Sequence, residues 1–205
     1  MNFASDNAAG VVPAILKAIA EADSGFAIAY GNDDLTRRAE RRIADLFEHE
    51  AAVFLVPTGT AANALAIAHL SPPWGAVLCH AESHIATDEA GAPEFFGGGL
   101  KLVGLPGEAG KITPAIVEEA LGRGRGAPHA VLPSLLSLTQ STEAGTVYTN
   151  AEVAALAALA HARGLSVHMD GARFANAVAA LGCTPAEATW KAGVDVLSFG
   201  ATKGG

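Results

Sequence analysis

The chain has 205 residues, of which 50% are apolar and 17% are charged, a balance that excludes a disordered chain and fits one large domain. The formal net charge is −8, so we expect no nucleic-acid partner, since such proteins carry a basic face. No apolar run reaches the 18 or so residues of a membrane-spanning helix, and residues 1–7 lack the pattern of a signal peptide. With only two, widely spaced cysteines, we expect a cytoplasmic protein that is not associated with a membrane.

The first half of the chain alternates between amphipathic repeats and short apolar runs. Side chains that are apolar at every third or fourth position predict helices, and apolar runs of four to eight residues predict buried strands. Pro13 is favourable in the first turn of a helix. The elements expected here are helices over 13–22, 35–50 and 61–70 and strands over 51–56, 76–80 and 100–104.

The second half continues the alternation. The expected elements are helices over 113–121, 150–164, 173–182 and 184–193 and strands over 129–138, 165–169 and 195–200. Asn150 is the expected N-cap of its helix and Gly164 its stop. Strands that alternate with helices predict an α/β fold of three layers, with a mainly parallel, mixed sheet between two layers of helices. We place no domain boundary within the chain.

Ligands of such folds collect at the carboxyl ends of the strands. The segment PTGTAAN (57–63) places Thr58, Gly59 and Thr60 between an expected strand and an expected helix. Free N–H groups at a helix N-terminus, together with two hydroxyl groups, can bind a phosphate. The same residue types also occur in an ordinary helix cap, and both interpretations stay open.

Two further segments follow later strands. In HMDGAR (168–173), Asp170 could bind a cationic ring nitrogen and Arg173 a substrate carboxylate, or the two side chains could form an ion pair at a turn. Lys203 follows the last expected strand among small residues. It could form a Schiff base with a carbonyl group or be a solvated charge.

A metal site is the weakest alternative. His80 and His84 lie four residues apart, and they could join His168 and Asp170 as ligands of a metal hydrolase. The sequence HAESH does not match the HExxH pattern of zinc proteases. Loop histidines with local hydrogen bonds are the simpler interpretation, and we expect no metal.

Seven segments stand out by their order and spacing along the chain. They are FASDN (3–7), AYGND (29–33), PTGTAAN (57–63), SHIATDEAGAPEFF (83–96), TQSTEAGTVY (139–148), HMDGARFANA (168–177) and GVDVLSFGATKGG (193–205). Together they resemble the threonine aldolase family, above all its bacterial low-specificity L-threonine aldolases. The family consists of pyridoxal-phosphate enzymes of the aspartate-aminotransferase-like fold, in which a large domain binds the cofactor. The order and spacing of the segments carry the resemblance.

The resemblance implies a role for each matching residue. Lys203 holds pyridoxal 5'-phosphate as a Schiff base, Asp170 pairs with its ring nitrogen, and His84 stacks on its ring and is a candidate base. The other implied cofactor contacts are Thr58, Gly59, Thr60, Arg173 and Thr202. The implied substrate contacts are Ser5, Arg173 and Tyr30, the last supplied across a subunit interface.

The activity that the resemblance implies is the cleavage of L-threonine, L-allo-threonine and related 3-hydroxy amino acids to glycine and an aldehyde. The implied assembly is a homo-oligomer, a dimer of dimers. The alternative is another pyridoxal-phosphate lyase that acts on β-substituted amino acids, such as a phenylserine aldolase or a β-eliminating lyase.

Two departures from the family pattern matter. Many relatives carry a second histidine where this chain has Thr142 or Glu143, so the base for the β-hydroxyl group is either His84 or a water held by one of these residues. The chain also ends two residues after Lys203, whereas relatives continue into a smaller C-terminal domain. We therefore expect residues 1–205 to be the cofactor-binding large domain with its N-terminal segment, able to bind the cofactor with little turnover.

Overall fold

A computed structural model describes residues 5–123 and 127–204. They form two compact units, and each is described by itself. The larger unit is Val56–Gly200, and the smaller one comprises the described residues of Met1–Leu55 and Ala201–Gly205. The expected single domain over 1–205 stays a prediction.

The larger unit contains a five-stranded sheet. Its strands are β1 (Gly75–His80), β2 (Lys101–Leu105), β3 (Leu132–Thr139), β4 (Ser166–Gly171) and β5 (Val196–Phe199), in the order β2-β1-β3-β4-β5. Each neighbouring pair is parallel, so the described strands form a parallel sheet where the sequence had allowed a mixed one. Pro133 is accommodated at the start of β3, where the register with β1 shifts between Ala76 and Val77.

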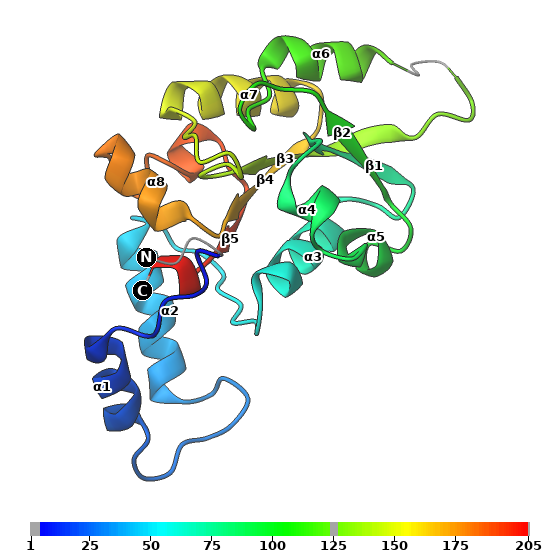
Figure 1. The fold of residues 1–205 in the computed structure, drawn as a ribbon. Helices are drawn as coiled ribbons and strands as arrows, with labels where there is room; N and C mark the ends of the chain where they lie inside the picture. The colour runs from blue at the N-terminus through cyan, green and yellow to red at the C-terminus, as the bar shows by residue number, and fades with distance from the viewer. Residues whose placement is uncertain (1–4, 124–126, 205) are drawn as a thin grey trace. The chain divides into compact units, whose positions relative to one another are not determined.

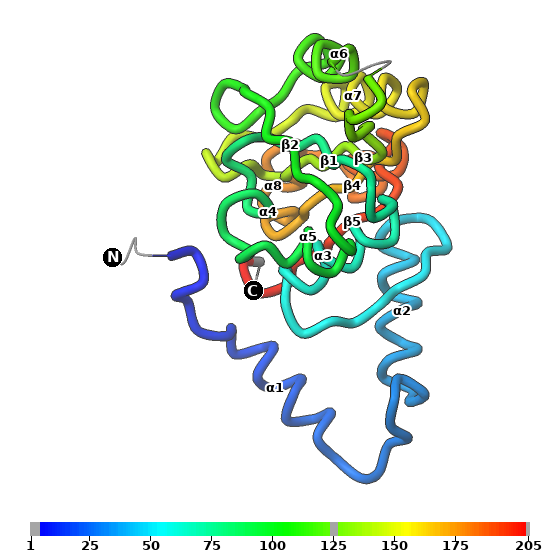
Figure 2. Tube along the Cα trace, turned by 90° about the vertical axis from the view of Figure 1, so that its right-hand side faces the viewer, coloured from blue at the N-terminus to red at the C-terminus, as the bar shows by residue number. Residues whose placement is uncertain are grey.

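Helices cover both faces of this sheet. Figures 1 and 2 show α6 and α7 over one face and α3 with α5 over the other. The expected three-layer α/β/α fold is therefore confirmed. The helices of this unit are α3 (Gly59–Leu70), α4 (His84–Thr87), α5 (Ala92–Phe96), α6 (Pro114–Gly122), α7 (Asn150–Ala162) and α8 (Phe174–Leu181), with the short 3₁₀ helix η1 (Trp190–Ala192).

The core lies between the sheet and its helices. All six residues of β1 are buried, as expected for a central parallel strand that is covered on both faces. Ile67 of α3 packs with Val77 and Leu135 in one cluster from which solvent is excluded. α7 buries Val153 and Leu156, among other residues of one face. This packing holds α3 against the strands whose carboxyl ends are described below.

The start of α7 differs from the expectation. Its N-cap is Thr149 and not Asn150, because Thr149 Oγ1 accepts a hydrogen bond from the Glu152 N–H group. The Glu152 carboxylate in turn accepts from the Thr149 N–H group at 2.7 Å, which completes a capping box. Lys111 also contacts this carboxylate, and its hydrogen bond lowers the pKa of Glu152. Gly164, with φ of +75°, follows the end of the helix as expected.

The smaller unit contains α1 (Pro13–Ala22), α2 (Asp34–Leu46) and the 3₁₀ helix η2 (Thr202–Gly204). α1 has the predicted bounds, and α2 begins one residue before the predicted range and ends four before its end. The Asp33 side chain caps α2 by accepting hydrogen bonds from both the hydroxyl and the N–H group of Thr36, which lower the pKa of Asp33. Among the described residues, none of the helices is both long and apolar enough to cross a membrane.

Two predicted elements are wrong. Residues 51–56 form no strand, and Phe54 and Leu55 are 82% and 67% exposed. An apolar run indicates burial only where a neighbouring strand takes up its N–H and C=O groups, and the described sheet offers none to this segment. The helix expected over 184–193 is reduced to a turn and η1. Thr184 and Glu187 bond to each other's N–H groups as in a helix cap, but Thr189, with φ of −129° and ψ of −105°, departs from helical geometry and interrupts the helix.

The capping box of α7 can be tested by substitution. Thr149→Ala removes the acceptor for the Glu152 N–H group and should lower the free energy of unfolding by about 1 kcal/mol. Asn150→Ala, one position along, should change it by less than about 0.5 kcal/mol. Urea unfolding followed by circular dichroism measures both, and a larger loss at Asn150 would contradict the assignment of the cap.

Candidate active site

The segments that follow β1, β3 and β4 leave the parallel sheet at its carboxyl edge, and polar residues of these segments contact one another. β1 lies between β2 and β3, so the chain winds away from it in both directions, and a crevice forms at such a point. The main-chain N–H group of His84, which follows β1, donates to Glu143 Oε1 at 2.8 Å. Glu143 belongs to the loop after β3, so this bond joins the segments that follow β1 and β3.

His84, Glu89 and Asp170 each offer a polar atom, and these three atoms lie within 4.8 Å of one another. The distance from His84 Nδ1 to Glu89 Oε1 is 2.9 Å. Asn63 Nδ2 donates to Glu89 Oε1 at 2.7 Å and to Asp170 Oδ2 at 2.9 Å. The four side chains therefore form one hydrogen-bonded network.

Each member of the network comes from a well-defined element. Asn63 projects from the first half of α3, and His84 begins α4. Glu89 follows α4, and Asp170 is the penultimate residue of β4. The second oxygen of Asp170 accepts from the Ala172 N–H group at 2.9 Å, which fixes the rotation of the carboxylate.

The network is shielded from water. Asn63, Glu89 and Asp170 are 2%, 4% and 4% exposed, whereas His84 is half-buried. Burial raises the pKa of Glu89, and its hydrogen bonds to Asn63 and His84 oppose that shift. A buried carboxylate is tolerated only with such partners.

A second histidine lies beneath Asp170 on the same face of β4. His168 is fully buried, and its Nδ1 and Nε2 atoms lie 2.9 and 3.0 Å from the hydroxyl groups of Ser137 and Ser198. Burial lowers the pKa of His168 to about 4, an effect that the charge of Asp170 opposes. His168 is therefore neutral near pH 7 and fills the core.

The metal site considered from the sequence does not assemble. His80 Nδ1 accepts from the Glu82 N–H group, and His168 is held by serine residues, so neither joins His84 and Asp170. The Asn63 amide group lies between the carboxylates of Glu89 and Asp170. Its NH₂ group bonds to one oxygen of each carboxylate.

The N-terminus of α3 is open. Thr58 Oγ1 accepts from the Ala61 N–H group at 3.0 Å, so Thr58 caps the helix. The N–H groups of Gly59 and Thr60 have no partner within the described chain, and the space beside Gly59 is free for 4 Å. Asn63 lies four residues after Gly59, or about 6 Å along the helix. An anion at the helix end would thus lie close to the Asp170 network, which fits a phosphorylated pyridine.

The remaining predicted residues are divided between the units. Arg173 is half-buried in the larger unit, just before α8. Ser5, Tyr30, Thr202 and Lys203 belong to the smaller unit. There, Lys203 Nζ lies 3.3 Å from Asp6 Oδ1, and the Lys203 side chain is only 13% exposed. It is thus a partly buried ion pair and not a solvated charge. Tyr30 is 99% exposed.

Sequence reasoning missed Asn63 and Glu89, although both lie in segments that it quoted. The available signal was the carboxylate five residues after His84 and the amide four residues after Gly59. The structure also separates Thr142 from Glu143. The Thr142 hydroxyl group lies 2.8 Å from that of Thr146 and is 1% exposed as a residue, so it braces its own loop, whereas Glu143 contacts His84.

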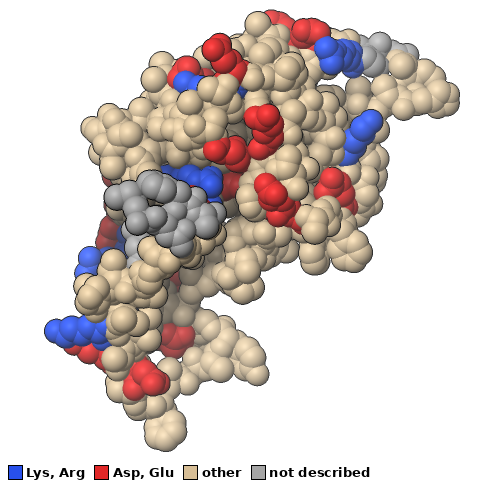
Figure 3. Space-filling model, viewed as in Figure 1, with Lys and Arg blue, Asp and Glu red and all other residues tan. Residues whose placement is uncertain are grey.

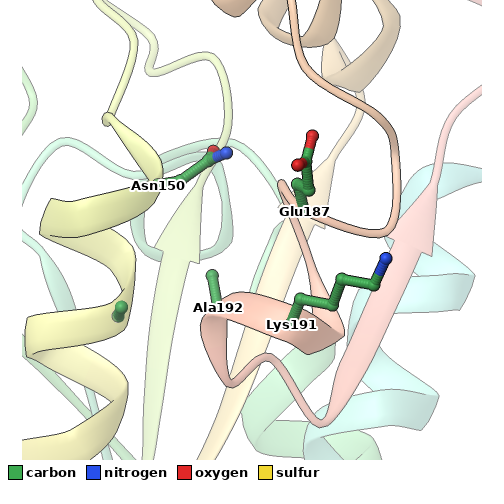
Figure 4. A pocket seen from close by; sticks show the side chains of 5 residues that line it. Asn150, Glu187, Lys191 and Ala192 are labelled. Atoms are coloured by element: carbon green, nitrogen blue, oxygen red, sulfur yellow. The ribbon is translucent and has the colours of Figure 1, made fainter.

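A surface hollow of about 290 Å³ lies elsewhere, and it contains none of the predicted site residues. Figure 4 shows Asn150 at the start of α7 facing Glu187, with Lys191 and Ala192 of η1 below them. On the face drawn in Figure 3, acidic side chains are scattered among basic ones. Neither feature competes with the carboxyl edge as a candidate active site.

A parallel three-layer fold with an anion site and a buried carboxylate at its carboxyl edge is typical of cofactor-binding α/β enzymes. The family model of the beta-eliminating lyases matches residues 2–205, and the chain belongs to this family. The resemblance to threonine aldolases found in the sequence motifs is confirmed by the relatives described next.

Two relatives and one solved structure illustrate the similarity in sequence and in fold. The chain is 49% identical over 203 residues to the low specificity L-threonine aldolase of Pseudomonas aeruginosa and 48% identical over 203 residues to that of a Pseudomonas species. These alignments cover 99% of this chain and 58% of each relative. The solved structure, the threonine aldolase of Leishmania major, superposes with a TM-score of 0.91 at 34% identity, over 98% of this chain and 58% of that one.

The neutral state of His168 predicts a pH dependence of stability. Its pKa of about 4 lies below the ordinary value of 6.5, so between these values the unfolded chain binds more protons than the folded one. The contribution of neutral His168 to the free energy of unfolding is therefore complete above pH 6.5 and is lost as the pH falls towards 4. The loss at pH 4.5 should be on the order of 2 kcal/mol.

His168→Gln should flatten the rise in the free energy of unfolding between pH 4.5 and pH 7, whatever it does to stability at pH 7. His69→Gln, at an exposed position of α3, is the matched control and should keep the slope of the unmodified chain. Chemical unfolding at several pH values measures both, and equal slopes for the two variants would sink the assignment.

Proposed function

We propose that the chain forms the pyridoxal-phosphate-binding part of an enzyme that cleaves L-threonine, L-allo-threonine and related 3-hydroxy amino acids to glycine and an aldehyde. The observation that carries this proposal is the network of Asn63, Glu89, His84 and Asp170, placed about one helical turn from the open N-terminus of α3. The Pseudomonas relatives, named as low specificity L-threonine aldolases, support the choice of reaction.

The donor set fits the proposed cofactor. Thr58, Gly59 and Thr60 at the N-terminus of α3 suit a phosphate group. Asp170 is buried and has the charge that a protonated pyridine nitrogen requires. When bound, pyridoxal phosphate supplies an electron sink for the bond that breaks at Cα. In this proposal, Thr202 is a further contact and Lys203 bonds to the cofactor aldehyde.

The substrate is oriented by its carboxylate. A guanidinium group can bind a carboxylate through two parallel hydrogen bonds, so Arg173 is assigned this role together with Ser5. Held in this way, the substrate would have a fixed orientation, which would determine which bond at Cα breaks. Tyr30, which is exposed in the single chain, is assigned to the site of a neighbouring subunit.

His84 is assigned as the base for the β-hydroxyl proton. Its ring is half-buried at the carboxyl edge, and its Nδ1 atom is taken up by Glu89, which leaves Nε2 for the substrate. Because the Thr142 hydroxyl group already bonds within its loop, the rival base is a water held by Glu143.

A second candidate function is β-elimination on the same scaffold. The family to which the chain belongs is described as beta-eliminating lyases, and that chemistry would use the same Lys203 and Asp170. A phenylserine aldolase is a variant of the first proposal with a larger aldehyde product.

Assembly and location complete the proposal. α1 exposes Val12, Ile15, Leu16 and Ile19 along one face, each by more than 40%, which supports burial against another subunit in a homo-oligomer such as a dimer of dimers. Both cysteines are free, which supports a reducing, cytoplasmic location.

The role of Lys203 is tested by reduction with borohydride. The chain mixed with pyridoxal phosphate should show a visible absorbance band that borohydride removes, with the label on the peptide containing Lys203. Lys203→Ala should lose the label, whereas Lys101→Ala, an exposed lysine at the start of β2, should keep it. A label that persists in Lys203→Ala would overturn the assignment.

The reaction is tested by its products. With L-threonine, retro-aldol cleavage yields glycine and acetaldehyde in equal amounts, whereas elimination yields 2-oxobutanoate and ammonia. We expect glycine and acetaldehyde, measured by mass spectrometry however slow the turnover. A predominance of 2-oxobutanoate would replace the first proposal by the second.

A further inference from the structure

The orientation of the Asn63 amide group is fixed by its neighbours. It lies within hydrogen-bond distance of a carboxylate oxygen of Glu89 and of one of Asp170. Carboxylate oxygens accept hydrogen bonds, so the NH₂ group faces both of them and the amide oxygen points away. That oxygen, Asn63 Oδ1, is buried without a partner in the described chain, which is the cost of this arrangement.

The same bond determines the role of Glu89 Oε1. Asn63 Nδ2 can only donate, so Oε1 is the acceptor at 2.7 Å. An oxygen that accepts so short a bond is a poor position for a proton. If Glu89 carries one, the proton belongs on Oε2, which is buried and has no partner in the described residues. In either protonation state, Oε1 therefore presents a lone pair to His84.

His84 must then donate to Glu89. Its Nδ1 atom lies 2.9 Å from Oε1, and two acceptors at that distance would repel, so the hydrogen of the neutral ring is on Nδ1. The charged groups that face this residue are Glu89 at the ring, Glu143 at the main-chain N–H group and Asp170 across the network. All three are acidic, and Glu89 is the one that contacts the ring, where it favours a donor at Nδ1.

We propose that Asn63 and Glu89 are positioning residues that hold neutral His84 as the tautomer with its hydrogen on Nδ1, which leaves the lone pair of Nε2 free to accept a proton. The use of that lone pair rests on the proposed function. The tautomer itself is a property of this chain and exists without cofactor.

His80 provides a contrast within the same molecule. Its Nδ1 atom accepts from the Glu82 N–H group at 3.1 Å, so the hydrogen of its neutral ring lies on Nε2, 3.3 Å from the carbonyl oxygen of Gly107. The two histidines, four residues apart, should therefore be opposite tautomers.

The experiment is a long-range ¹H–¹⁵N correlation spectrum of the ¹⁵N-labelled, cofactor-free chain at pH 8.5, above the range in which histidines ordinarily titrate. The two ring nitrogens of each neutral histidine have distinct shifts according to which one carries the hydrogen. We expect His84 as the Nδ1–H tautomer and His80 as the Nε2–H tautomer. An Nε2–H form of His84 in the unmodified chain would overturn the proposal.

Substitutions test which side chains impose the tautomer. Glu89→Leu removes the acceptor and should shift the tautomer ratio of His84 roughly fivefold towards Nε2–H, the equivalent of one hydrogen bond of about 1 kcal/mol. Glu89→Gln keeps an oxygen that can accept from Asn63 and His84 and should restore the ratio. Asn63→Leu frees Oε1 to take up a proton and should shift the ratio in the same direction as Glu89→Leu.

The unchanged spectrum of His80 shows in each variant that the fold is intact. An unaltered His84 ratio in a folded Glu89→Leu variant would mean that Glu89 does not determine the tautomer. Failure of the proposed function has a different signature. If the chain binds no pyridoxal phosphate but shows the expected tautomers, the positioning role of Asn63 and Glu89 is supported and the proposed reaction is contradicted.

Discussion

The candidate site depends on one amide group placed between two buried carboxylates. Without a donor between them, Glu89 and Asp170 would repel each other in a region of low dielectric constant, and one of them would have to take up a proton. Asn63 supplies one N–H group to each and adds no charge. The site can therefore keep an anion at Asp170 while Glu89 remains available to His84.

The fold places this amide group without relying on a flexible loop. α3 is packed on the sheet through Ile67, one turn beyond Asn63, and the sheet fixes Asp170 through its strand pairing with Ser198 of β5. Of the four residues, Glu89 comes from an irregular segment and His84 begins the short helix α4. These two are joined to each other and, through Glu143, to the loop after β3. Parallel topology brings these segments together because the carboxyl ends of all the strands meet at one edge.

The sequence predicted the alternation of strands and helices because a buried parallel strand and an amphipathic helix each have a local signature. The prediction failed where the local pattern of apolar residues was not sufficient to form the element. Residues 51–56 have the composition of a strand but no partner strand, and the departure of the Thr189 backbone from helical geometry is not visible in the periodicity of residues 184–193. Asp170 could be found because it follows an expected strand, and His84 because its segment resembles a family motif, whereas the burial of Asn63 and Glu89 arises only from the packing of α3 on the sheet.

The placement of two functions on one helix has a geometric consequence. The open N–H groups of Gly59 and Thr60 and the amide group of Asn63 belong to the same α3, so helical rise alone fixes the spacing between the anion site and the carboxylate pair. A ligand that contacts both the anion site and the carboxylate pair must therefore match this spacing in length. An insertion or deletion of one residue between Gly59 and Asn63 would turn the amide group by about 100° around the helix axis. The amide group would then no longer face the two carboxylates. Substitutions on the exposed side of the same helical turns leave the spacing between the two sites unchanged.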